Sequence, residues 1–281
     1  MRIIKYDDVV ETVAKLCKEA NYYLGNDVLE VLQSALEKEE SEAGKEVLNQ
    51  LLDNARLGLN NDVPVCQDTG TAVVFLEYGQ DVSIDKGSIN DAINEGVRKG
   101  YIEGYLRKSV VDDPLIKRIN TKDNTPAVIH TTVVPGDKLK ITVAPKGGGA
   151  ENCSAIKMMT PSDGYNGVKK FVIDTVLKAG PNPCPPIVVG VGIGGNFEKA
   201  AFLAKKALIR PLNQNHPDPQ FAALEKELLE EINELGIGPQ GFGGRITALK
   251  VNVETFPCHI ASMPVAVNIN CHSTRHKSAV L

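Results

Sequence analysis

The chain has 281 residues, a formal net charge of −4 and an aromatic content of 5% without tryptophan. Because it lacks both a basic charge balance and aromatic stacking groups, we expect a small-molecule partner and no nucleic acid. Acidic residues near the N-terminus replace the apolar core that a signal peptide needs, and no apolar run approaches membrane-spanning length. We therefore expect a cytoplasmic protein with no membrane contact.

The sequence contains six cysteines, at positions 17, 66, 153, 184, 258 and 271. Disulfides are not expected, because cytosolic thiols are kept reduced. No CxxC spacing occurs, so neither a zinc ribbon nor a thioredoxin-type redox pair is indicated. A site that uses several cysteines must therefore be assembled from distant loops.

The first 60 residues carry helical periodicity. Helices are predicted over 6–20, 28–38 and 43–55. Cys17 lies on the apolar stripe of the first helix, so we expect it to pack in the core as a small apolar residue.

From Val63 onward, β-branched and small residues alternate with helical segments. The predicted elements are a turn and strand over 63–79, a helix over 88–107, two strands within 127–149 joined by a Pro-Gly-Asp turn, a helix over 164–179 stopped by Gly180, a strand over 187–195, helices over 196–208 and 220–235, and strands over 247–255 and 262–269. We expect an α+β (mixed α/β) fold, with a helical N-terminal region over 1–60 followed by mixed sheets and glycine-rich loops over 61–281. A single catalytic domain over 1–281 is predicted.

The segment from Pro64 to Gly70 concentrates a thiol, an amide, a carboxylate and a hydroxyl in one turn before a buried strand. Loops held by a rigid scaffold often carry function. The alternative is an ordinary polar turn with a buried cysteine. A second segment, Lys146 to Asn152, contains three consecutive glycines, which permit close approach of the main chain to an anion. A flexible hairpin loop is the alternative there.

Cys184 lies among prolines, and the glycine pattern GVGIGG follows over 190–195. This pattern satisfies GxGxxG and raises the possibility of an NAD-dependent dehydrogenase. The pattern lies late in the chain, however, and about twenty residues further on no strand ends in an acidic residue to bind the ribose. In the tail, Cys258, His259, Cys271 and His272 could suggest zinc, but adjacent Cys258 and His259 are poorly placed to share one tetrahedral ion.

Four motifs occur in order: CQDTGTA, KGGGAEN, CPP before a glycine-rich strand, and HIASMPVAVNINCHSTR. Together they resemble the alpha-type catalytic region of class I fumarases and the related tartrate dehydratases. The resemblance implies a [4Fe–4S] cluster bound by Cys66, Cys184 and Cys271, with the fourth iron open to act as a Lewis acid. Cys153 and Cys258 match no ligand position and are expected to be structural.

The same resemblance implies that Gln67, Asp68, Arg107, Gly149 and His259 contact the substrate. Asp68 is the candidate for acid–base catalysis. The Arg107 guanidinium suits a substrate carboxylate, which it can bind through two hydrogen bonds. Its alternative role is to interact favourably with the negative end of the helix predicted over 88–107.

The implied reaction is reversible hydration of fumarate to (S)-malate, a step of the tricarboxylic acid cycle, with dehydration of tartrate as the alternative. Single-chain relatives have a second domain that supplies the proton-abstracting group, and this sequence ends where that domain would begin. The resemblance therefore implies a beta-type subunit on a separate chain, in a heterotetramer of two alpha and two beta subunits. A cluster protein for electron transfer stays open as a further alternative, and it would need a fourth ligand such as Cys258.

Overall fold

The computed structural model describes residues 1–281, and the chain forms two compact units. Unit 1 contains residues 1–24, 55–148 and 275–281, and unit 2 contains residues 25–54 and 149–274. Each unit is thus built from segments that are distant in the sequence. The expectation of a single catalytic domain stays a prediction.

The helical N-terminal region is confirmed. It consists of α1 (Tyr6–Tyr22), α2 (Asn26–Lys38) and α3 (Glu42–Asn61). Cys17 is fully buried on α1, and this burial raises the pKa of its thiol to about 12. Cys17 is therefore a protonated core residue, as its position on the apolar stripe predicts. None of the helices has the length and apolar character that crossing a membrane requires.

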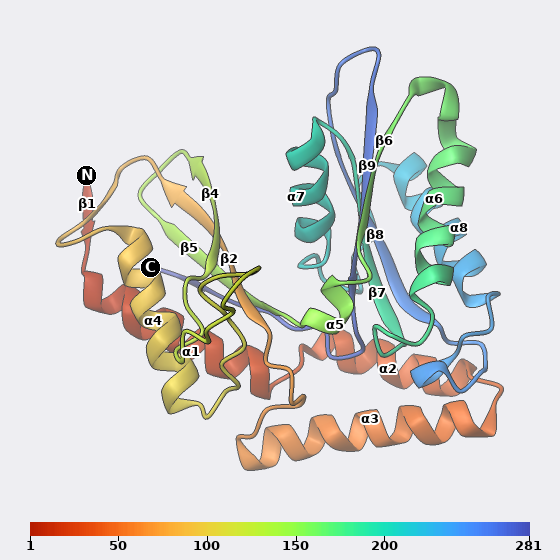
Figure 1. Cartoon of the computed structure of the whole chain (residues 1–281), viewed down its shortest axis with the longest axis horizontal. Coiled ribbons are helices and arrows are strands. Elements are labelled where there is room, and N and C mark those ends of the chain that lie inside the picture. The colour runs from red at the N-terminus through yellow and green to blue at the C-terminus, as the bar shows by residue number, and fades with distance from the viewer. The chain divides into compact units, whose positions relative to one another are not determined.

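Unit 1 is built around a four-stranded mixed sheet (Figure 1). The strand order is β10 (Lys277–Val280), β5 (Leu139–Lys146), β2 (Thr71–Gly79) and β4 (Val128–Val134). Helices α1 and α4 (Ile89–Glu103) pack against each other, and their apolar residues share a core with the alternate β2 residues Ala72, Val74 and Leu76. Strand β2 therefore occupies the centre of the sheet, with its N-terminal end directly after the predicted functional turn.

The strands β4 and β5 do not pair as a hairpin, although a Pro-Gly-Asp turn joins them. Strand β2 lies between them, parallel to β4 and antiparallel to β5. The turn crosses the end of β2, where Gly79 N donates to Lys138 O (2.9 Å) and Asp81 N donates to Gly136 O (3.0 Å). The largely buried β2 is therefore hydrogen-bonded to a strand on each edge. The residues of the turn do not indicate that a third strand lies between the two that it joins.

Four short strands were not predicted. One of them is β10, at the edge of the unit 1 sheet. In unit 1, β1 (Arg2–Ile4) and β3 (Val82–Ile84) form a parallel pair. In unit 2, β6 (Ala155–Met159) is antiparallel to β9 (Met263–Asn270). Segments of three to five residues are too short to show a clear alternation of apolar and polar side chains.

Unit 2 has three layers (Figure 1). Its sheet has the order β6, β9, β7 (Ile187–Gly194) and β8 (Ala248–Phe256). One face packs against α6 (Gly164–Ala179) and α8 (Pro219–Asn233), and the other against α7 (Phe197–Ala207). Short 3₁₀ helices cover Pro161–Asp163 and Pro239–Gly241. Helix α6 has the predicted bounds, and Gly180 ends it with a positive φ of 53°.

The glycines of GVGIGG explain how closely α7 packs on β7. A Cβ atom added at Gly190 would lie 2.1 Å from Ala204 O, and one added at Gly192 would lie 2.1 Å from Ala200 O. Neither position can hold a larger residue without moving the helix. Close packing of helix on strand therefore accounts for both glycines without a dinucleotide.

Buried carboxylates tie the loops of unit 2 to its sheet. Glu39, after α2, is 2% exposed and accepts hydrogen bonds from the amides of Glu40, Ser41, Arg245 and Ile246. Burial alone would raise the pKa of Glu39, but these four amides outweigh it and hold the pKa below its usual value. The charged form of this side chain therefore links the end of α2 to the segment that leads into β8.

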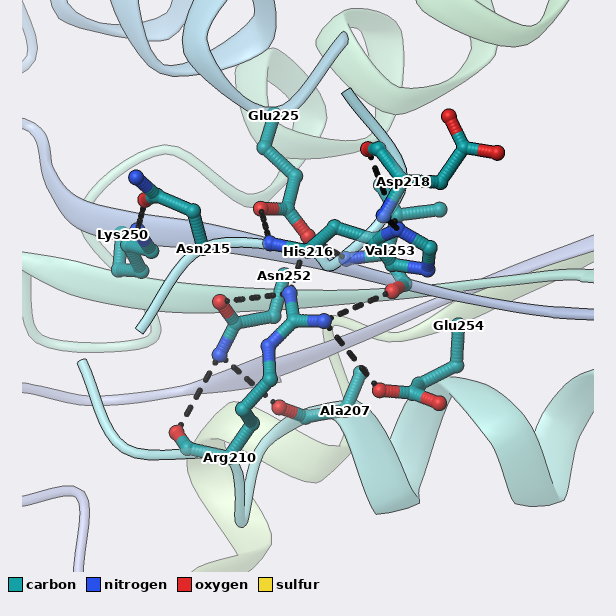
Figure 2. Close-up of polar contacts among 10 residues, drawn as sticks. All are labelled: Ala207, Arg210, Asn215, His216, Asp218, Glu225, Lys250, Asn252, Val253 and Glu254. Carbon is teal, nitrogen blue, oxygen red and sulfur yellow. Dashed lines mark hydrogen bonds and ion pairs between the residues drawn. The ribbon is translucent and has the colours of Figure 1, made fainter. Parts of the chain in front are cut away.

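The second carboxylate, Glu225 of α8, lies at the free edge of β8 (Figure 2). It pairs with the Arg210 guanidinium and accepts from Val253 N (2.8 Å) and His216 N (3.1 Å). Arg210 also donates to Val253 O (3.2 Å) and to Asn252 Oδ1 (3.0 Å). The ion pair thus satisfies edge groups of β8 that have no neighbouring strand.

Candidate active site

The turn before β2 holds Asp68 by its own main chain. The Asp68 carboxylate accepts hydrogen bonds from Gly70 N (3.0 Å) and Gly148 N (2.8 Å). Asp68 is half-buried, and Gln67 beside it is exposed. One carboxylate therefore joins the CQDTG turn to Gly148 of the KGGG segment within unit 1.

The turn also depends on Gly70 and Tyr101. Gly70 has a φ of 69°, and an added Cβ would lie 2.6 Å from Lys146 O. The fully buried Tyr101 hydroxyl of α4 lies 2.7 Å from Thr69 O and 3.2 Å from Gly70 O. Burial raises the pKa of Tyr101, so the hydroxyl remains a donor at neutral pH.

Arg107 lies outside the helix that was predicted to contain it. Helix α4 ends at Glu103, four residues earlier, so the helix-dipole role considered for Arg107 is not supported. The Arg107 side chain is exposed, and its carbonyl oxygen accepts a hydrogen bond from Thr69 Oγ1 (3.1 Å). Gly104 and the left-handed Tyr105 (φ 50°) end the helix and redirect the chain. The main chain of Arg107 is therefore hydrogen-bonded to the side chain of Thr69, the residue that follows Asp68.

Sequence reasoning did not single out Arg275. This residue is 5% exposed, and its Nη2 donates to the main-chain oxygen of Asp68. It ends the motif HIASMPVAVNINCHSTR, but arginine at the end of a motif does not by itself indicate a buried contact. The structure thus adds a cation that fixes the backbone of the turn.

In unit 2 the structure brings together the loops of Cys184 and Cys271. His272 N donates to Cys184 O (3.3 Å). Cys184 is exposed with a left-handed φ of 54°, and the Sγ of half-buried Cys271 lies 3.1 Å from Ser273 Oγ. Two of the three predicted cluster cysteines therefore lie on hydrogen-bonded loops. Cys66, the third, is half-buried at the start of the turn in unit 1.

Gly149 belongs to a short helix, α5 (Gly148–Glu151), where a loop was expected. Its carbonyl oxygen accepts a hydrogen bond from the Cys153 thiol (3.4 Å), and Glu151 pairs with Lys205 and binds Asn268 (2.8 Å). Gly149 itself is exposed. The segment therefore forms a short helix anchored by side-chain contacts and not a hairpin loop.

His259 lies in the loop between β8 and β9, at the end of β9 opposite Cys271. The eight residues of β9 span seven rises of about 3.4 Å, which place the ends of the strand about 24 Å apart. His259 is exposed, and its Nδ1 accepts from Ala261 N (3.1 Å). Neighbouring Cys258 is also exposed, and its thiol donates to Ser262 O (3.1 Å). Within unit 2, His259 is therefore remote from the cysteine loops, and its substrate contact stays a prediction.

None of the six cysteines forms a disulfide, and neither unit by itself contains three or more His, Cys, Asp or Glu side chains placed to hold a metal ion. The chemistry of the predicted ligands nevertheless fits an iron–sulfur cluster, because thiolates are its usual protein ligands. The exposed Cys184 and half-buried Cys271 stand on loops that are already joined to each other. The residues present therefore suit such a group.

Comparison with known proteins shows the family. The family model "Fumarate hydratase (Fumerase)" matches residues 10–280. A Methanocaldococcus jannaschii protein named "Putative L(+)-tartrate dehydratase subunit alpha" is 45% identical over 272 residues, which cover 95% of each chain. The L(+)-tartrate dehydratase subunit alpha of Escherichia coli strain UTI89 is 34% identical over 271 residues, covering 95% of this chain and 88% of the relative. The chain therefore belongs to the fumarate hydratase family, whose members are hydro-lyases.

Proposed function

We propose that this chain is the alpha subunit of a [4Fe–4S]-dependent hydro-lyase that hydrates fumarate reversibly to (S)-malate. The observation that carries the proposal is the family match over residues 10–280, which spans the constrained turn from Cys66 to Gly70. The reaction would be that of the tricarboxylic acid cycle. Six cysteines without a disulfide suit a reducing cytoplasm.

Cys66, Cys184 and Cys271 would hold the cluster. When bound, the cluster would supply an iron without a protein ligand, as a Lewis acid for a substrate carboxylate and hydroxyl. Cys258 is a poorer candidate for a fourth ligand, because it precedes β9 whereas Cys271 follows it. This separation favours a hydro-lyase over an electron-transfer protein, in which every iron normally has a cysteine ligand.

The chain's own residues would bind and orient the dicarboxylate. Arg107 is exposed and would bind one carboxylate through both arms of its guanidinium. The Gly149 amide would donate a further hydrogen bond, and Gln67 would contact the substrate beside Asp68. The two amides that hold the Asp68 carboxylate leave its remaining lone pairs available to exchange a proton with the substrate hydroxyl.

A beta-type subunit on a separate chain would complete the enzyme. Support comes from the relatives, which are named as alpha subunits and are matched over 88–95% of their own length. We propose a heterotetramer of two alpha and two beta subunits, in which the beta subunit supplies the group that takes a proton from carbon. The isolated alpha chain would then bind a cluster but turn over poorly.

Tartrate is the second candidate substrate, because the named relatives at 33–45% identity are alpha subunits of tartrate dehydratase. Fumarate hydration and tartrate dehydration both act on four-carbon dicarboxylates. The two substrates differ in hydroxylation, and discrimination between them requires groups that bind or exclude the additional hydroxyl.

The test is anaerobic reconstitution of the alpha chain with iron and sulfide, alone and with its beta subunit, followed by assays with fumarate, (S)-malate and L(+)-tartrate. The expected result is about four irons per alpha chain and dicarboxylate turnover only in the complex. Turnover of tartrate but not fumarate would select the second candidate. A loaded complex inactive on all three substrates, or full activity of the alpha chain alone, would contradict the proposal as stated.

A further inference from the structure

Asn124 lies in the long segment between α4 and β4 and has no accessible surface. Its Nδ2 donates to Gly70 O (3.1 Å), and its Oδ1 accepts from Ser109 N (2.7 Å). Both partners are main-chain groups in unit 1, and each belongs to a segment that carries a proposed substrate-binding residue. Gly70 is two residues after Asp68, and Ser109 is two residues after Arg107.

The side chain is itself held in place. Its neighbour Asp123 pairs with Arg98 of α4 through Arg98 Nε (2.9 Å), and also accepts from Thr125 N (3.0 Å) and Thr125 Oγ1 (2.7 Å). Burial would raise the pKa of Asp123, but these partners outweigh it and lower the pKa to about 2. Asp123 is therefore ionised at neutral pH and remains paired with Arg98 of α4. This ion pair fixes the backbone next to Asn124.

The amide makes both bonds because it carries a donor and an acceptor on one rigid group. Aspartate would keep an acceptor for Ser109 N, but it would place a second oxygen against Gly70 O and bury a charge. Alanine would remove both bonds, the partly buried one from Ser109 N and the buried one to Gly70 O. The chemistry at position 124 therefore couples two chain segments and does not simply fill space.

We propose that Asn124 is a positioning residue of the active site, which sets the spacing between the Arg107 segment and the Asp68 turn. The inference rests on the proposed function, because it takes Arg107 as the carboxylate clamp and Asp68 as the acid–base group. The bond from Thr69 Oγ1 to Arg107 O (3.1 Å) is a second link between the same segments. Together, the Asn124 bonds and the Thr69 bond fix the main chain near Arg107 relative to the main chain near Asp68.

The experiment uses the cluster-loaded complex of alpha and beta chains with Asn124→Ala and Asn124→Asp. Asn252→Ala in unit 2 is the matched control, because Asn252 is also fully buried and donates to a main-chain oxygen, Ala207 O (3.0 Å). At wild-type iron content, both Asn124 variants should lose about 100-fold in kcat/KM, because misplacement by about 1 Å can cost that much. A higher KM and a lower kcat should both contribute. The control should keep both constants within about twofold, whatever its thermal stability.

A second readout does not depend on activity. Deuterium exchange should increase together over residues 66–76 and 105–112 in Asn124→Ala, and in neither segment in Asn252→Ala. If Asn124→Ala does not fold, Thr69→Val breaks the second link and should raise KM, whereas Thr69→Ser should restore it. Wild-type constants in a fully loaded Asn124→Ala complex, or unchanged exchange in both segments, would overturn the inference. Inactivity of the wild-type complex would instead refute the proposed function, and the exchange data would still decide whether Asn124 couples the segments.

Discussion

Glu225→Gln should destabilise the folded chain strongly, although it changes no proposed catalytic group. The carboxylate is 3% exposed and its partner Arg210 is 12% exposed, so neither charge is well solvated. Glutamine keeps one acceptor oxygen but directs an NH₂ group at one of the donors now bound, and Arg210 loses its counter-charge. Removing one partner of a buried ion pair costs about 3–5 kcal/mol. We expect about 3 kcal/mol, the lower end of this range, because Arg210 keeps its bonds to Asn252 Oδ1 and Val253 O.

The assay is urea unfolding followed by circular dichroism, with Asp174→Asn as the control. Asp174 pairs with Lys170 on the surface of α6 (2.8 Å), and the two side chains are 55% and 75% exposed. Loss of such an exposed pair should cost about 0.5 kcal/mol or less. Combining Glu225→Gln with Arg210→Met should recover about 2 kcal/mol through their coupling. A free energy of unfolding within about 1 kcal/mol of wild type for Glu225→Gln would refute this account of the pair.

Three further predictions concern the cluster, acid stability and packing. Serine at any of the three proposed cluster cysteines should remove most bound iron, whereas Cys258→Ser should keep it; iron loss only in Cys258→Ser would reverse the ligand assignment. Because the pKa of Glu39 is lowered in the folded state, its stabilisation is present above pH 4.5 and is lost as the pH falls through the folded-state value. Unfolding free energies from pH 7 to 3 should therefore decline less in Glu39→Gln than in wild type; parallel curves would contradict this. Gly190→Ala should lower the unfolding free energy by about 1–3 kcal/mol or more, because its Cβ would overlap α7; a thermal midpoint equal to wild type would show that the helix can shift without cost.

Local patterns predicted the longer elements well. The apolar stripe of α1 and the glycine that ends α6 depend on neighbouring residues in the chain, and both agree with the structure. Elements whose stability comes from distant partners were missed or misplaced. The strands β1, β3, β6 and β10 are too short for a periodic signal. Helix α4 was extended four residues too far because the backbone change at Gly104 and Tyr105 was not recognised.

The candidate site shows the same division. Cys66, Asp68 and Arg107 were proposed from motifs, which are local properties of the sequence. The contacts that hold them could not be identified in this way. Asn124 and Arg275 are far along the chain from the turn, and each donates a hydrogen bond to a main-chain oxygen there, which gives no sequence signal.

The sequence by itself determined the family, the mixed α/β class, the helical N-terminal region and the residues proposed for the chemistry. Hydrophobic periodicity, glycine placement and motif order are properties of the sequence, and they can be recognised without knowledge of the fold. Only the tertiary structure decided that β2 separates β4 from β5, that two glycines of GVGIGG accommodate a helix, and that Asn124 joins the segments of Gly70 and Ser109. These features depend on hydrogen bonds and close contacts between residues far apart in the chain, and such contacts form only when the chain has folded.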